Sequence, residues 1–238
     1  MPSPELWAAG AVSAGGLFAG AAAALFHPRA TVFGPCVWRG PEHRPWVALT
    51  FDDGPHPHYT PRIAEILDAH RAPATFFCVG ARLKAQSALG AALHAAGHQL
   101  ANHTYAHGTG RDLFSERRLT ADLARSEEVL LGITGRRGRF YRPAVGIRNP
   151  VVQRAARAVG LTVVTWTHAA RDGAFALSAR KARALAARAG PGAILALHDG
   201  SVRESSPLRE ATVSHLPVLL AGLRERGLTP VTLETLLS

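Results

Sequence analysis

The 238-residue sequence is poor in cysteine and lysine, and both shortages narrow the possible classes of protein. Its two cysteines, Cys36 and Cys78, lie far apart and form no CxxC pair, so neither a disulfide framework nor a cysteine-rich zinc site is expected. Only two of the 27 cationic residues are lysines, and the arginines form no run longer than the pairs at 117–118 and 136–137. Without a basic block or tail, the net charge of +10 does not indicate nucleic-acid binding. A basic surface beside an anionic membrane or cell wall, or a coding bias toward arginine, explains it equally well.

Charged residues are absent from Leu6–Phe26, which is long enough for a membrane-spanning helix of about 20 residues. No basic residue precedes this run, so an uncleaved anchor is favoured over a signal peptide, while a helix packed on the domain stays open. We therefore predict an N-terminal apolar segment at residues 1–30 and one domain at 31–238. The protein is expected at a membrane, but its side is open. The arginines after the run favour the cytoplasm, although that rule is weak for one short segment before a large domain.

From residue 46 onward, short β-rich runs alternate with helical patterns. The seven expected strands are Trp46–Phe51, Ala74–Val79, His98–Ala101, Phe140–Arg142, Leu161–Trp166, Ala193–Leu197 and Thr229–Thr232. Helical patterns between them include Gln86–Ala96, Ser115–Leu131, Ser178–Ala189 and Leu208–Arg226. This alternation predicts an α/β fold with a parallel sheet or barrel and helices outside. Polar side chains that follow its strands should therefore meet at one rim.

Two histidines and two carboxylates are candidates for a metal centre on that rim. His103 and His107 are four residues apart, which on a helical turn places both imidazoles on one face. Asp52 and Asp53 follow the first strand, and two adjacent carboxylates repel unless a cation lies beside them. Two histidines and one carboxylate are typical of catalytic zinc sites, which keep positions open for water. An ordinary acidic turn is the alternative for the aspartates.

Three further residues are candidates for proton transfer and positioning. Arg142 follows the fourth strand and either pairs with an active-site carboxylate or forms a surface ion pair. His198 ends a very apolar strand, a position that favours acid–base chemistry over a core histidine. Asp172 could orient its ring and raise its pKa.

The motifs in chain order are TFDDGP at Thr50–Pro55, HTYAH at His103–His107, RPAVG at Arg142–Gly146, a segment from Trp166 to Asp172, and LALHD at Leu195–Asp199. Together they resemble the five motifs of the polysaccharide deacetylases, carbohydrate esterase family 4, whose domain is the nodulation-type chitooligosaccharide deacetylase homology domain. The resemblance covers about residues 45–235. It implies a distorted TIM-like (β/α)7 barrel and a divalent metal, most often zinc, with cobalt, nickel and manganese as alternatives.

The same resemblance implies a role for each matching residue. Asp53, His103 and His107 would hold the metal. Asp52 would be the base for metal-activated water, positioned by Arg142. His198, tuned by Asp172, would be the acid that protonates the departing amine. The main-chain N–H near Val145, together with Thr104 and Trp166, would serve the oxyanion and the substrate.

The sequence departs from the family at two aromatic positions, with Val145 in place of a common tyrosine and Gly173 in place of a common tryptophan. These changes bear on sugar specificity more than on the chemistry. The expected activity is removal of N-acetyl groups from amino sugars of a peptidoglycan-like or chitooligosaccharide-like glycan by a monomer. One alternative is deacetylation or deformylation of a lipid-linked or small amino sugar at the membrane, with which the low aromatic content of 7% is compatible. The other is a non-catalytic carbohydrate-binding module.

Overall fold

The computed structural model describes residues 27, 29, 31–108, 114–201, 203 and 205–238. The predicted anchor at Leu6–Phe26 lies outside these residues and stays a prediction. Within the described ranges, no helix combines the length and apolar character that crossing a membrane requires.

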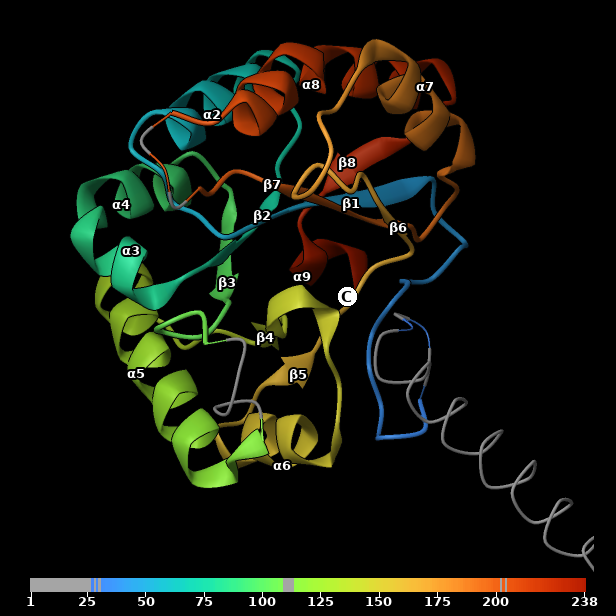
Figure 1. Ribbon diagram of the computed structural model, residues 1–238. Coiled ribbons are helices and arrows are strands. Elements are labelled where there is room, and N and C mark those ends of the chain that lie inside the picture. The colour runs from blue at the N-terminus through green and yellow to red at the C-terminus, as the bar shows by residue number, and fades with distance from the viewer. Residues whose placement is uncertain (1–26, 28, 30, 109–113, 202, 204) are drawn as a thin grey trace, which may run out of the picture.

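The described residues form one curved sheet of parallel strands (Figure 1). The strands are β1 (Trp46–Asp52), β2 (Thr75–Cys78), β3 (Gln99–Asn102), β4 (Phe140–Tyr141), β5 (Thr162–Val163), β6 (His168–Ala169), β7 (Ile194–His198) and β8 (Thr229–Val231). Their order is β5-β4-β3-β2-β1-β7-β6, and β8 pairs with the first half of β1 while β2 pairs with its second half. The parallel sheet predicted from the sequence is confirmed.

The sequence predicts a closed barrel of seven strands, but the observed sheet is open. Among the described residues it has eight strands, and its outer strands β5 and β6 do not pair with each other. The segment before β1 occupies the gap: Val37 N–H donates to the Val163 carbonyl at 2.9 Å, and Gly40 N–H donates to the Gly192 carbonyl at 2.8 Å. The expected strand Leu161–Trp166 is reduced to β5 and an isolated bridge between Val164 and Val37, and the chain re-enters the sheet as β6. The result is a half-barrel.

Helices cover the outside of the sheet, as predicted. They are α2 (Tyr59–Ala69), α3 (Gly80–Ala85), α4 (Ser87–Ala95), α5 (Glu116–Thr134), α6 (Pro150–Ala158), α7 (Ala179–Arg188) and α8 (Pro207–Glu225). A short helix α9 (Leu233–Leu236) and a 3₁₀ turn at Ala144–Gly146 complete the helical elements of the described residues. In Figure 1, α2, α7 and α8 cover the β1–β7 side, α3, α4 and α5 lie beside β2 and β3, and α6 lies beside β5. The short helices α3 and α9 were not predicted, because four to six residues give too little periodicity to recognise.

Alternation along β1 separates the core from the site. Val47, Leu49 and Phe51 point outward into the apolar layer beneath α2, α7 and α8. On the other face, Ala48 packs against Leu233 of α9, which lies inside the half-barrel (Figure 1). Thr50 and Asp52 continue that inner row. The strand period therefore aims Asp52 into the mouth of the half-barrel.

Candidate active site

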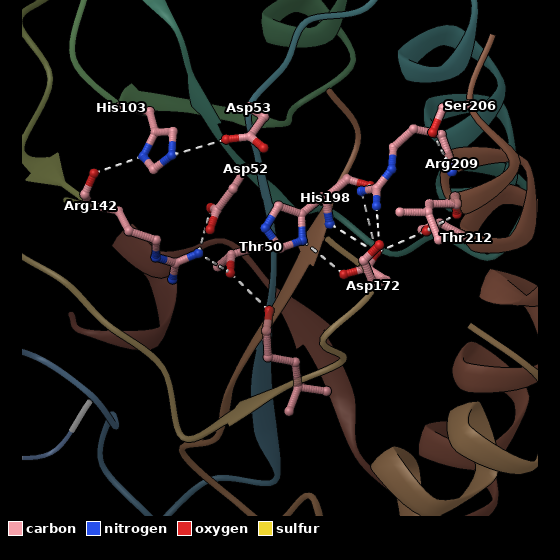
Figure 2. Close-up of polar contacts among 12 residues, drawn as sticks. Thr50, Asp52, Asp53, His103, Arg142, Asp172, His198, Ser206, Arg209 and Thr212 are labelled. Carbon is pink, nitrogen blue, oxygen red and sulfur yellow. Dashed lines mark hydrogen bonds and ion pairs between the residues drawn. The ribbon is translucent and has the colours of Figure 1, made fainter. Parts of the chain in front are cut away.

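Asp52 and Arg142 form a buried ion pair at the carboxyl end of the sheet (Figure 2). Arg142 Nη1 donates to Asp52 Oδ1 and to Thr50 Oγ1, both at 2.7 Å, and Nη2 donates to the Thr165 carbonyl at 2.8 Å. The guanidinium has no solvent exposure and lies 4.1 Å from the centre of the Phe77 ring. Contacts on three sides fix the guanidinium, which in turn fixes the rotamer of Asp52.

Asp53, His103 and His107 converge in a second cluster. Asp53 Oδ1 lies 3.3 Å from His103 Nε2 and 3.0 Å from His107 Nε2, and one ligand atom from each residue falls within 4.8 Å of the other two. Burial alone would raise the pKa of Asp53, but hydrogen bonds from His103 and His107, with positive charge on His103 and His198, hold it well below its usual range.

The ring orientation of His103 fits a cation. Its Nδ1 lies 2.7 Å from the Arg142 main-chain carbonyl, which only accepts hydrogen bonds, so Nδ1 carries the proton. The other ring nitrogen, Nε2, faces the Asp53 carboxylate. When Nε2 is unprotonated, its lone pair and the carboxylate oxygen are two ligands for one cation. Two imidazole nitrogens and one carboxylate oxygen are suitable ligands for zinc and similar divalent ions.

The histidines converge through a loop, so the predicted helical turn at His103–His107 is wrong. Thr104 and His107 adopt left-handed conformations, with φ of 65° and 54°, which a helical turn excludes. Side chains stabilise this path: Asn102 Oδ1 accepts from Thr104 N–H at 2.8 Å, and Thr104 Oγ1 accepts from His107 N–H at 3.0 Å. From α5, the Asp122 carboxylate accepts the N–H groups of residues 105 and 106.

His198 and Asp172 form the third part of the site. His198 Nδ1 lies 2.8 Å from Asp172 Oδ1, and the His198 main-chain N–H donates to Oδ2 at 3.1 Å. Burial disfavours the charged ring, but Asp172 outweighs it, and with smaller contributions from Asp52 and Asp53 the pKa of His198 rises to about 9. At Gly173, an added Cβ would lie 3.1 Å from His198 Nε2, so the glycine leaves that edge uncovered.

Sequence reasoning missed the residues behind Asp172. From α8, Thr212 Oγ1 donates to Asp172 Oδ2 at 2.8 Å, and Arg209 lies 3.6 Å from the same oxygen (Figure 2). Arg209 also donates to the main-chain carbonyls of Asp172 and His198. No local motif marks these two residues, because α8 reads as an ordinary amphipathic helix.

Two more polar residues support the loop that carries Asp53. Asp199 is fully buried, and its Oδ2 accepts from Thr60 Oγ1 at 2.5 Å; burial raises the pKa of Asp199 to about 7. Arg82, from α3, donates to the main-chain carbonyl of Asp53, a residue whose φ is 73°. Asp199 directly follows His198 in the LALHD motif, and that position is the feature of the sequence by which it could have been predicted.

The remaining predicted residues lie nearby. Thr104 is 1% exposed, and its hydroxyl is used within the histidine loop. Val145 belongs to the 3₁₀ turn Ala144–Gly146 that follows Arg142. Trp166 packs closely against Gly146, where an added Cβ would lie 2.4 Å from the indole ring. The oxyanion and substrate roles of these three residues stay predictions.

A positioned carboxylate, a His₂Asp donor set and a carboxylate-backed imidazole at the carboxyl ends of parallel strands define a hydrolytic site. The comparisons agree. Residues 39–164 match the polysaccharide deacetylase family. A chitooligosaccharide deacetylase from Sinorhizobium fredii is 34% identical over 192 residues, which cover 77% of this chain and 87% of that protein.

Solved structures show the same fold. A peptidoglycan N-acetylglucosamine deacetylase superposes with a TM-score of 0.76 and 27% identity, covering 84% of this chain and 92% of the other. A family 4 pseudoenzyme from Bacillus anthracis has a TM-score of 0.74 and 25% identity, covering 86% and 69% respectively. The chain belongs to the polysaccharide deacetylase family, carbohydrate esterase family 4. It is a hydrolase that acts on carbon–nitrogen bonds other than peptide bonds.

Proposed function

We propose that the protein is a metal-dependent N-deacetylase that converts N-acetylated amino sugars of a glycan into acetate and free amino sugar. The observation that carries the proposal is the convergence of the Asp52–Arg142 pair, the Asp53–His103–His107 cluster and the His198–Asp172 pair in one mouth. Relatives named as chitooligosaccharide and peptidoglycan deacetylases support the substrate class. Because a structural neighbour is a pseudoenzyme, the site residues carry more weight than the fold.

Asp53, His103 and His107 would hold a divalent cation, for which zinc is the first choice and cobalt, nickel and manganese are alternatives. When bound, such a cation supplies Lewis acidity that makes water a better nucleophile and stabilises negative charge on the acyl oxygen. The chain contributes the fixed geometry: the Arg142 carbonyl sets the tautomer of His103, and Asp122 holds the loop between the histidines.

Proton transfer is divided between the two sides of the mouth. Asp52 accepts a proton from the attacking water, and Arg142 keeps this carboxylate oriented. The new carbon–oxygen bond forms as the oxyanion develops, and the main-chain N–H near Val145 is the proposed donor to it. His198 Nε2 then protonates the amine nitrogen as the carbon–nitrogen bond breaks. With its pKa at about 9, His198 holds that proton at neutral pH.

Replacement of each neighbouring aspartate tests the two roles. Asp52→Asn should lower kcat by about 10²–10⁴-fold while metal stays bound, because only the base is lost. Asp53→Asn should lower metal affinity, because a charged ligand is lost. Acetate release and metal content after dialysis measure both effects. Full activity of Asp52→Asn would contradict the assigned base.

A substrate panel tests the function itself. Zinc-loaded protein should release acetate from chitooligosaccharide or peptidoglycan, and chelation should stop the reaction until metal is restored. Lipid-linked N-acetylated sugars, with formate measured as well, test the membrane alternative. No product from any substrate, with metal bound, would favour a carbohydrate-binding module.

A further inference from the structure

The positive charge of the chain is concentrated in one stretch of the sequence, residues 129–198. This stretch holds 12 of the 27 lysines and arginines but only one of the 17 aspartates and glutamates, a net charge of +11. The rest of the chain holds 15 cations and 16 acidic residues, a net charge of −1. The one acidic residue of the stretch, Asp172, is buried. A coding bias toward arginine does not explain this local absence of acidic residues.

Part of this stretch forms an exposed cationic pocket where β6 and α7 pack together, on the right of Figure 1. The pocket has a volume of about 760 Å³, and Arg171, Lys181 and Arg188 line it together with no acidic residue. Within the described part of the chain, none of these three cations forms a salt bridge with a carboxylate. Arg154, in the same stretch, does pair with Glu116. The cations of the pocket therefore face solvent.

The first described residues of the chain lie against the same pocket. Arg29 Nη2 donates to the main-chain carbonyl of Thr167, which lines the pocket, at 3.3 Å. His168, the next lining residue, responds to cations from both sides: burial and the charges of Arg188, Arg29 and Arg39 lower its pKa. Cations from α7 and from the N-terminal segment therefore act at one place, where the potential is positive.

Apolar groups accompany these cations. Phe175, which also lines the pocket, is 61% exposed, and Lys181 Nζ lies 5.6 Å from the centre of its ring. The uncharged run Leu6–Phe26 ends directly before His27, so the sequence passes from an apolar run to Arg29 within three residues. Cations, an exposed aromatic ring and an adjoining apolar sequence are the combination that binds the headgroup region of an anionic bilayer.

We propose that the α7 face, defined by Arg29, Arg171, Phe175, Lys181 and Arg188, docks on the surface of a membrane that contains anionic phospholipids. The cations pair with lipid phosphates, and the Phe175 ring enters the layer between headgroups and acyl chains. A soluble polyanion would satisfy the cations but offers no apolar layer for Phe175, so the lipid surface is favoured. The inference concerns where the protein is held, and it does not depend on the proposed deacetylase function.

Two matched double variants of the full chain test the docking. K181A/R188A removes one lysine and one arginine from the α7 face, and R71N/K84A removes one of each from exposed positions after α2 and on α3. Asparagine is used because Arg71 has φ of 52°, which asparagine tolerates. Co-sedimentation gives partition coefficients on phosphatidylcholine vesicles and on an equal mixture with phosphatidylglycerol. Insertion of the run Leu6–Phe26 contributes to both coefficients, so their ratio isolates the contribution of charge.

The ratio of mixed to neutral vesicles should fall by roughly ten-fold in K181A/R188A and stay within about two-fold of the wild-type value in R71N/K84A. High salt should remove the wild-type preference for mixed vesicles without any substitution. Phe175→Ser should weaken binding to mixed vesicles by a few-fold, because it removes the apolar contact and keeps the cations. A wild-type ratio near one, or equal ratios in the two double variants, would overturn the inference.

Soluble polyphosphate is the competing ligand and separates a lipid surface from a general polyanion site. The proposal expects mixed vesicles to bind more tightly than polyphosphate at equal phosphate concentration, and expects Phe175→Ser to weaken only the vesicle binding. Polyphosphate binding as tight as vesicle binding, lost in K181A/R188A and unchanged together with vesicle binding in Phe175→Ser, would overturn the lipid assignment.

Discussion

Two aspartates of the site contact histidine rings, but they contact different ring nitrogens. Asp53 faces two Nε2 atoms, in the manner of a metal ligand. Asp172 faces Nδ1 of His198 and is completely buried, in the manner of a partner that tunes a general acid. His103 and His198 therefore differ in chemistry because of what contacts their rings: a neutral carbonyl at Nδ1 of His103, and a carboxylate at Nδ1 of His198.

The pKa of His198 can be measured directly. In the metal-free protein, NMR titration of the ring should give a pKa near 9, and Asp172→Asn should lower it, because burial then acts without a compensating negative charge. Since the folded pKa is raised, the protonated ring stabilises the fold fully below about pH 6.5, and this contribution is lost as the pH rises through 9.

The same substitution has a kinetic consequence. The acid works only when protonated, so the alkaline limb of kcat/KM should move to lower pH in Asp172→Asn. Thr212→Val removes one donor from Asp172 but keeps its negative charge, so the alkaline limb should not move to lower pH in this variant. An alkaline limb at the wild-type pH in Asp172→Asn would argue against His198 as the acid.

At the scale of elements, α5 acts on the histidine loop from outside the sheet. Asp122 accepts from Tyr105 N–H at 2.7 Å and from Ala106 N–H at 3.1 Å, and Arg125 stacks over the Tyr105 ring. Asn102, at the end of β3, bonds Glu127 of the same helix at 2.9 Å. Helix α5 therefore holds this loop at Asn102, where it begins, and at residues 105 and 106, between the two histidines.

Asp122→Ala should loosen the metal site without unfolding the protein. We expect zinc affinity to fall by about 10–100-fold, the range typical of lost outer-shell support, while helix content stays at the wild-type level. Glu128→Ala removes an exposed carboxylate from the same helix and provides the control. Equal zinc affinity in the two variants, measured by competition with a chelating dye, would contradict this support.

The element predictions failed where local periodicity was short or was overridden. The spacing of His103 and His107 fits a helical turn. Instead, the side chains of Asn102 and Thr104 accept main-chain N–H groups and stabilise a loop in which Thr104 and His107 are left-handed. Both residues are visible in the sequence. The outcome depended on Asp122, which is 15 residues beyond His107 and reaches the loop only after α5 has packed.

At the scale of the whole molecule, the half-barrel depends on the segment at 36–40, which pairs with the chain after β5 at Val164 and with the chain before β7 at Ala193. Gly192, just before β7, has φ of 76°, and an added Cβ would lie 2.3 Å from the Gly40 carbonyl oxygen. Close approach of these two main chains is possible only with glycine at 192.

Gly192→Ala should therefore destabilise the fold by about 2–5 kcal/mol, the sum of left-handed backbone strain and a steric clash. Gly97→Ala is the matched control: φ is 87° there, but nothing lies within 4 Å of an added Cβ, so only strain of about 1–2 kcal/mol is expected. Urea unfolding compares the two. Equal losses would mean that the 36–40 crossing adapts to a side chain at position 192.

The sequence by itself determined the α/β alternation, the family and the residues that stand at strand ends, because strand periods and short motifs are local properties of the chain. Tertiary structure alone decided three things. The half-barrel stays open because residues 36–40 occupy hydrogen-bonding positions beside β5. Asp172 lies beneath His198 because Arg209 and Thr212 reach it from α8. A pocket forms beside β6 because one face of α7 packs near that strand. Each of these depends on contacts between segments distant in the chain, which no local pattern encodes.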